Sequence, residues 1–267
     1  MNAVAEKEIV SHVMGILSKD LPEPRIIVVG CGGAGCNIVG QVRERSMLNL
    51  ETVAINSDEE SLGRIVSDIK IRLGKGSRFS KGAHGVPEDG RDLAEAARES
   101  ISSTVKADIA FLVVGLGGGI GTGCAPKVSE IVRESGAVVI AIPVMPFSIE
   151  GRDSVAEKGL RELRAAADST IVLENNSLLE FGQDTPLANA FSILNGVIAG
   201  LIECVVERIS RTFLTVLEDE VEVMARDIKM AVEVQQSGEG KLVPLPPLEA
   251  QGEMSTFPND FTTFDTD

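Results

Sequence analysis

Two stretches of the sequence are rich in glycine, and each follows a run of apolar residues. The first spans residues 30–35 (GCGGAG), and the second places six glycines in the nine positions from Gly115 to Gly123. A strand that ends in such a turn and continues as a helix presents several backbone N–H groups to one point, at the positive end of the helix dipole. Glycine lets an anion approach these groups and tolerates positive φ. Both stretches therefore predict phosphate binding.

The spacing within the loops narrows the choice of phosphate ligand. Residues 30–35 satisfy GxGxxG, and Asp58 lies 23 positions after Gly35, so this part alone would suggest a Rossmann domain that binds NAD. The second loop is not a Walker A motif, because Cys124 rather than lysine follows Gly123. A dinucleotide fold has no need of a second, richer phosphate loop three strands later. Two loops at one sheet edge favour a nucleoside di- or triphosphate.

The elements that must position these loops alternate regularly. From Arg25 to Asn176, apolar runs rich in Val and Ile alternate with helical patterns. This alternation predicts an α/β fold with a mostly parallel sheet and helices on both faces. The segment from Leu201 to Gln236 contains neither Gly nor Pro, which predicts that the chain ends in a long helix.

The chain is therefore expected to divide into four parts. Residues 1–24 form an amphipathic extension, 25–185 the α/β domain, 186–236 the long helix and its extension, and 237–267 a disordered acidic tail. The tail carries isolated phenylalanines among acidic residues, which is typical of a short motif that folds on a protein partner, although a plain flexible tail fits equally.

Composition excludes several classes of protein. The 267 residues include 40 acidic and 25 basic side chains, a net charge of -15, which argues against nucleic acid as a partner. No apolar run reaches the roughly 18 residues needed to span a membrane, so a cytoplasmic protein is expected. The four cysteines are scattered and form neither a zinc pattern nor a disulfide framework, so no protein-held metal is predicted.

Six segments in order resemble the FtsZ/tubulin family, over roughly residues 25–211. The resemblance implies a GTPase domain that binds GTP and GDP, with Mg²⁺ bound through the phosphates. The similar segments are VVGCGGAGCNIV at 28–39, AINSD at 54–58, KGAHGVPEDGR at 81–91, GLGGGIGTGCAP at 115–126, PFSIEGR at 146–152 and VLENN at 172–176.

The resemblance also implies roles for individual residues. Glu150 and Arg152 would approach the ribose, Phe191 would stack on the base, and Asn175 and Asn195 would read the base. The residues implied to line the phosphates are Gly32, Gly33, Ala34, Asn37, Gly117, Gly118, Gly119, Gly121, Thr122 and Gly123.

Three positions depart from the family pattern. Asn195 stands where FtsZ usually has Asp, and because an amide both accepts and donates, it discriminates less sharply for guanine than a carboxylate. Ile120 replaces a threonine of the family's signature loop and so loses a hydroxyl near the phosphates. His84 replaces a glycine in the segment that resembles the γ-phosphate loop.

The resemblance stops near the end of the long helix. The family completes its active site with acids from the next subunit, and the matching acids here are Glu218, Asp219 and Glu220, which could equally be a solvated helix face. The family's C-terminal domain is expected to be absent. Apolar residues at alternating steps of three and four, from Leu214 to Ala231, would then lack their usual cover. This row of apolar residues, the seam from Leu214 to Ala231, predicts pairing with another chain, most simply a homodimer.

These observations lead to one main hypothesis and two alternatives. The main hypothesis is a GTP-binding, FtsZ-like cytoskeletal protein of cell division in a prokaryote, with slow or assembly-dependent hydrolysis. The first alternative is a GTP-dependent switch or scaffold that does not hydrolyse GTP and acts through its long helix. The second is a Rossmann oxidoreductase.

Overall fold

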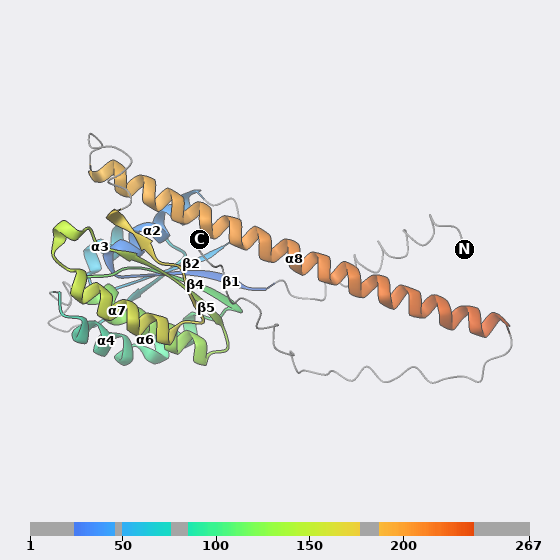
Figure 1. The fold of residues 1–267 in the computed structure, drawn as a ribbon. Coiled ribbons are helices and arrows are strands. Elements are labelled where there is room, and N and C mark those ends of the chain that lie inside the picture. The colour runs from blue at the N-terminus through green and yellow to red at the C-terminus, as the bar shows by residue number, and fades with distance from the viewer. Residues whose placement is uncertain (1–23, 46–49, 76–84, 177–186, 238–267) are drawn as a thin grey trace.

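The computed structural model describes residues 24–45, 50–75, 85–176 and 187–237, with only part of the side chains after residue 213 (Figure 1). The amphipathic extension, His84 of the expected γ-phosphate segment and the acidic tail all lie outside the described residues. The same is true of the side chains of the expected seam between Leu214 and Ala231. Predictions that depend on these parts stay predictions.

Seven strands of the described chain form one sheet in the order β3-β2-β1-β4-β5-β6, with β7 also paired to β5. Every pairing is parallel, which confirms the predicted fold class. The strands are β1 (Ile26–Cys31), β2 (Glu51–Asn56), β3 (Ile69–Arg72), β4 (Ile109–Gly115), β5 (Val138–Met145), β6 (Ser169–Thr170) and β7 (Leu173–Glu174).

Helices cover both faces of the sheet (Figure 1). On one face, α2 (Gly32–Arg45) and α8 (Leu187–Ser237) pack on alternate strand residues such as Val28 and Phe111. On the other face lie α4 (Pro87–Ala96), α5 (Arg98–Thr104), α6 (Gly119–Glu134) and α7 (Asp153–Ala166), over Ile27 and Leu112 among others. The short α3 (Glu59–Arg64) follows β2. Burial on both faces explains why the central strands are continuous apolar runs.

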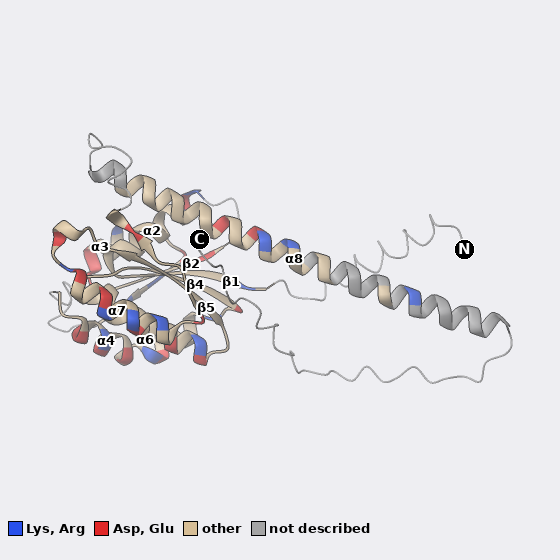
Figure 2. Cartoon of the chain, in the orientation of Figure 1, with Lys and Arg blue, Asp and Glu red and all other residues tan. Residues whose placement is uncertain are grey.

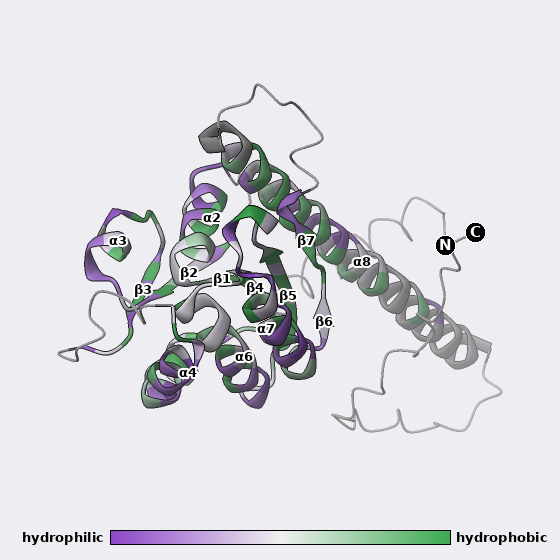
Figure 3. Ribbon diagram, turned by 60° about the vertical axis from the view of Figure 1, so that its left-hand side comes forward, coloured by the Kyte–Doolittle hydropathy of each residue, from purple (hydrophilic) through white to green (hydrophobic). Residues whose placement is uncertain are grey.

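Polarity is distributed as this two-faced burial requires. Hydrophobic residues gather on the strands and on the inner sides of the helices (Figure 3). Charged residues are frequent along α4, α6 and α7, while the middle strands carry few of them (Figure 2). Arg98 of α5 joins two of these helices, since it pairs with Glu95 of α4 at 2.7 Å and with Glu134 of α6 at 2.5 Å. Such exposed pairs contribute at most about 1 kcal/mol each.

The helix α8 is 51 residues long, which confirms the predicted long C-terminal helix. Its first half packs on the sheet through Leu194, Ile198 and Ile202. Beyond Arg211 the helix continues past the sheet for about 40 Å, at ~1.5 Å per residue (Figure 1). Within that projecting part Val216 and Val223 are half exposed. None of the described helices is long and apolar enough to cross a membrane.

Candidate nucleotide-binding site

Two glycine loops meet at the carboxyl edge of the sheet. Strands β1 and β4 are neighbours, with Cys31 in register with Val114, so the loops that follow them lie side by side. The contact is backbone against backbone: a Cβ added to Gly32 would lie 2.8 Å from the nitrogen of Gly121. Gly32 has φ 72° and Gly117 has φ 96°, conformations that side chains disfavour. The loops can touch only because both lack side chains.

The glycines of these loops serve two different purposes. A Cβ at Gly35 or Gly123 would overlap a backbone carbonyl of another element, that of Val113 or Pro87 respectively. These glycines allow close packing. By contrast, a Cβ at Gly33 or Gly118 would meet no atom within 4 Å. The open positions face the space where a ligand can lie.

Several residues that line that space have backbone N–H groups without partners. In the described chain, the amides of the four residues from Gly118 to Gly121 have no hydrogen-bond acceptor. The amides of Gly33 and Ala34, in the first turn of α2, are also without one. Both rows lie at the positive ends of helices, of 14 and 16 residues. Such rows of free donors bind anions, phosphate above all.

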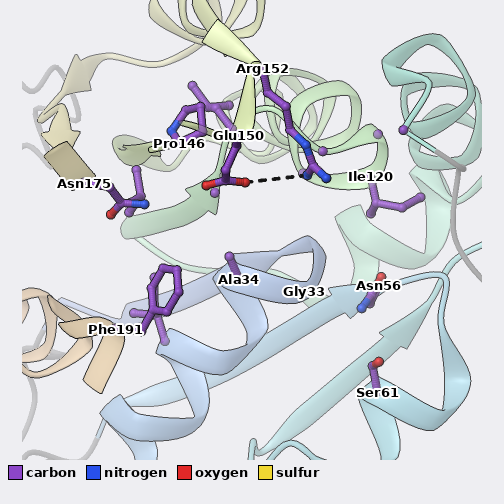
Figure 4. A pocket seen from close by; sticks show the side chains of 18 of the residues that line it. Gly33, Ala34, Asn56, Ser61, Ile120, Pro146, Glu150, Arg152, Asn175 and Phe191 are labelled. Carbon is purple, nitrogen blue, oxygen red and sulfur yellow. Dashed lines mark ion pairs between the residues drawn. The ribbon is translucent and has the colours of Figure 1, made fainter. Parts of the chain in front are cut away.

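A cavity of about 450 Å³ opens over the two loops (Figure 4). It is walled by β4, β5 and the start of α8 in addition to the loops themselves. Ten of the residues that the family resemblance singled out line it: Gly33, Ala34, Gly118, Gly119, Gly121, Glu150, Arg152, Asn175, Phe191 and Asn195.

Five residues of the same set do not line this cavity. Gly32, Gly117, Thr122 and Gly123 belong to the loops but lie behind the wall. Asn37 lines an adjoining hollow of about 280 Å³, which shares Phe191 and Asn195 with the first. The two spaces therefore meet at the start of α8.

The segment after β5 forms one wall of the cavity. Glu150 ends a short 3-10 helix (Ser148–Glu150), and its Oε1 accepts a hydrogen bond from the Phe147 N–H at 3.0 Å. Its Oε2 lies 3.9 Å from Nη1 of Arg152 (Figure 4). Gly151, with φ 64°, makes the turn between the two. Their charges are thus held side by side at the cavity wall.

Phe191, at the start of α8, lies across the cavity from Glu150 (Figure 4) and packs against Phe147 of the segment after β5. The ring centroids of Phe147 and Phe191 are 5.5 Å apart with an interplanar angle of 72°. Phe147 is buried, while 38% of Phe191 is exposed. Edge-to-face packing on Phe147 holds the Phe191 ring in place, and its remaining surface lies at the cavity (Figure 4).

Two amide oxygens near this pair are buried and unpartnered. They are Oδ1 of Asn175, in the first cavity, and Oε1 of Gln41, in the adjoining hollow. Buried acceptors normally have a donor, so their presence at a cavity indicates a ligand that brings N–H groups. Sequence reasoning missed Gln41. Its position four residues after Asn37, on the same side of α2, was the signal that could have found it.

The β2 end contributes Asn56, Asp58 and Ser61 to the lining. Asn56 and Asp58 belong to the AINSD segment of the family resemblance, whereas Ser61 was not expected. Asp58 caps α3, since its Oδ1 accepts from the N–H groups of Glu60 at 3.0 Å and Ser61 at 3.1 Å. These hydrogen bonds, first of all the one from Ser61, lower the pKa of Asp58 below its usual value. The carboxylate of Asp58 therefore serves as the cap of α3 while it also lines the cavity.

The charges of the lining do not by themselves match a polyphosphate. Asp58 and Glu150 are acidic, and Arg152 is the basic residue among the lining side chains described. No cluster of three or more His, Cys, Asp or Glu side chains that could hold a metal exists in the described chain.

The acids expected to act in catalysis lie far from the cavity of their own chain. Glu218, Asp219 and Glu220 belong to α8, whose backbone is helical from Leu187 to Ser237. Glu218 is 23 positions after Asn195, which corresponds to roughly 35 Å along the helix. Within one chain they cannot reach the ligand, so any catalytic role would have to be in a second copy.

A parallel sheet with two amide-lined loops at adjacent strand ends defines a nucleotide-binding α/β domain. Residues 25–183 match the model of the Tubulin/FtsZ family, GTPase domain. The chain belongs to this family. The Rossmann oxidoreductase alternative is thereby wrong.

Curated relatives and solved structures agree with this assignment. Cell division protein FtsZ 2 of Halobacterium salinarum is 41% identical over 198 residues, which are 73% of this chain and 50% of that protein. The FtsZ 2 of Methanocaldococcus jannaschii is 38% identical over 196 residues, 73% of this chain and 52% of that protein. The chain thus spans about half the length of these relatives.

Among solved structures, the empty FtsZ dimer of M. jannaschii aligns with a TM-score of 0.68 at 35% identity, over 77% of this chain and 59% of that one. CetZ2 of Haloferax volcanii, a protofilament with bound GTPγS, has a TM-score of 0.62 at 20% identity, over 70% of this chain and 58% of that one. The second similarity shows the shared fold.

Proposed function

We propose that this chain binds GTP and GDP in the cavity over the two glycine loops and acts in the prokaryotic cytoplasm as an FtsZ-like cytoskeletal protein of cell division. The observation that carries the proposal is the row of unpartnered amides from Gly118 to Gly121, together with those of Gly33 and Ala34. Helix N-termini with free donors at one cavity suit a chain of phosphates. The relatives named as cell division proteins support the biological role.

The lining residues suggest how a guanosine would lie. With the phosphates over the amide rows, the ribose reaches Glu150 and Arg152, and the base reaches the face of Phe191. The unpartnered Oδ1 of Asn175 supports this pose, since guanine carries N–H donors on its edge. Gln41 and Asn195 add further amide groups around the same ring.

The charge of the lining supports a requirement for a divalent cation. Asp58 and Glu150 face a ligand that is itself strongly negative, and Arg152 offsets only part of this charge. When Mg²⁺ is bound to the phosphates, it offsets their charge and favours loss of the terminal phosphate. The protein's part is to hold the phosphates with amides and to shield the site.

Hydrolysis is proposed to be slow or dependent on assembly. The carboxylates of the lining are engaged: Asp58 caps α3, and Glu150 accepts from the Phe147 N–H. A group that orients water would have to come from Glu218, Asp219 or Glu220 of a second copy. A role in trans would make the site complete only between two molecules.

A second candidate function is a GTP-dependent switch or scaffold that does not hydrolyse GTP. The observation that favours it is the unbroken helical backbone of α8 through the three acids. On a continuous helix they need not enter a neighbour's cavity. The projecting half of α8 would then be the surface through which the protein acts.

Calorimetry and turnover measurements test both candidates. With Mg²⁺, GTP and GDP should bind, and ATP and NADH should bind at least about tenfold more weakly because their bases or second nucleosides do not fit the site. Preference for ATP or NADH would overturn the proposal. Turnover per molecule should rise with protein concentration and fall in a Glu218→Ala, Asp219→Ala, Glu220→Ala variant. Binding without phosphate release at any concentration would select the switch. Electron microscopy with GTP and with GDP would show whether filaments form.

A further inference from the structure

Thr122 lies behind the phosphate loop rather than on the cavity wall. Only 2% of the residue is exposed. Its Oγ1 accepts a hydrogen bond from the N–H of Gly117 at 2.8 Å. Its own N–H donates to the carbonyl of Gly118 at 3.1 Å. Thr122 therefore closes the loop by two bonds, one through its side chain and one through its backbone.

The side-chain bond determines which amides remain available. It occupies the N–H of Gly117, the residue with φ 96° at which the chain turns away from β4. The next four amides, from Gly118 to Gly121, are the ones without partners. Without the hydroxyl, the Gly117 N–H would be buried and unpaired, and the loop could relieve this only by changing its backbone conformation.

The methyl group of Thr122 connects the loop to α7. A Cβ added to Gly159 of α7 would overlap Cγ2 of Thr122, so the two residues are packed without a gap. A Cβ at Gly117 would lie 3.1 Å from Cβ of Arg152, which immediately precedes α7. The loop is thus held between the start of α7 and its second turn, with Thr122 as the inner contact.

We propose that Thr122 is a positioning residue for the terminal phosphates of the nucleotide. Its hydroxyl fixes Gly117, so that the amides of Gly118–Gly121 converge on one point, and its methyl fills the space beside Gly159 of α7. The inference rests on the proposed function, because it assumes that this cavity takes the phosphates of a guanine nucleotide. It assigns Thr122 an indirect role in place of the direct contact with phosphate expected from the family resemblance.

The test compares ligands with and without phosphates in two variants. Thr122→Val keeps the shape and removes the acceptor, whereas Thr122→Ser keeps the hydroxyl and removes the methyl. Thr122→Val should lower the affinity for GDP by about tenfold or more and leave the affinity for guanosine unchanged. The reason is that only the backbone amides that bind phosphate are misplaced. Thr122→Ser should stay within about threefold of the wild type for both ligands. Equal losses for GDP and guanosine in Thr122→Val, or no loss for either, would overturn the inference.

A second pair of variants tests the methyl contact and does not depend on the stability of Thr122→Val. Gly159→Ala should displace the Thr122 methyl. The affinity for GDP should then fall while the affinity for guanosine stays the same. Adding Thr122→Ser to Gly159→Ala vacates the space that the new methyl needs, and should restore GDP affinity. A double variant no better than Gly159→Ala alone would contradict the packing argument. If the wild type itself binds no guanine nucleotide, the proposed function fails, which is a different result from either of these.

Discussion

The backbone of Gly123 in α6 packs directly against the carbonyl of Pro87, at the start of α4. A Cβ at Gly123 would overlap that carbonyl, and Arg91 stands close behind it, its nitrogen 2.9 Å from the same point. Five residues earlier, a Cβ at Gly118 would meet nothing within 4 Å. One glycine run thus contains a residue needed for packing and a residue needed for access to the cavity.

Alanine substitutions should separate these two needs. Gly123→Ala should lower the free energy of unfolding by about 1–3 kcal/mol or more, because α4 and α6 must move apart. Gly118→Ala should change it by less than about 0.5 kcal/mol, because its φ of -94° and ψ of 159° suit any residue. The same Gly118→Ala substitution should lower the affinity for GDP by about tenfold, since the methyl of the new alanine occupies the floor of the cavity.

Urea unfolding without nucleotide and calorimetry with GDP would measure the two effects. The expected pattern is a stability loss for Gly123→Ala and an affinity loss at unchanged stability for Gly118→Ala. If Gly118→Ala bound GDP as tightly as the wild type, the phosphates would have to lie elsewhere.

The sequence predicted the fold well because the relevant signals are local. Runs such as 26–31 and 109–114 show burial on both faces directly, and the glycines that interrupt them mark the strand ends. It could not tell Gly123 from Gly118, because the difference depends on Pro87, which is distant in the chain. It also placed Thr122 at the phosphates, whereas the packing against Gly159 turns this side chain inward. Contacts between elements decide such cases.

Removal of the Phe191 ring should weaken guanine nucleotides without unfolding the protein. Stacking of a base on an aromatic ring contributes about 1–3 kcal/mol, so Phe191→Ala should weaken GDP by roughly 5–150-fold. Stability should fall only modestly, because 38% of Phe191 is exposed and its contact with Phe147 contributes about 0.5–1.5 kcal/mol. Ile193→Ala is a matched control on the same helix, since 56% of Ile193 is exposed and it lines neither cavity. Equal affinities in both variants, measured by calorimetry, would place the base away from Phe191.

The amide at Asn195 should make the site tolerant of xanthine. An amide can accept from the 2-amino group of guanine or donate to the 2-oxo group of xanthine, whereas a carboxylate only accepts. The wild type should therefore bind XTP within about tenfold of GTP, and Asn195→Asp should raise the preference for GTP by about tenfold or more. Competition of GTP and XTP against a fluorescent GDP derivative would measure the ratio. An unchanged ratio in Asn195→Asp would mean that this residue does not contact the edge of the base.

Stability should fall at alkaline pH because of the thiols beneath the phosphate loops. Burial raises the pKa of Cys36 from its ordinary value of 9.0 to about 12. The neutral thiol also donates a hydrogen bond to the carbonyl of Ile55 at 3.5 Å. Above about pH 9 the unfolded chain loses this proton while the folded protein keeps it. The stabilisation is therefore complete below about pH 9 and decreases by up to about 1.4 kcal/mol per pH unit toward the folded pKa. The pKa of Cys31 is raised as well, first by its hydrogen bond with Cys124 and then by burial.

Unfolding by urea at several pH values between about 7.5 and 10.5 would show this dependence. Cys36→Ala should flatten the decline, because one buried thiol no longer resists ionisation. Cys204→Ala is the control, because it removes an exposed thiol from the same protein. The buried groups would not govern alkaline stability if the two variants lost stability with pH at the same rate as the wild type. If the free energy of unfolding declined less steeply with pH in Cys36→Ala alone, the Cys36 thiol would be shown to stabilise the folded protein only while it is neutral.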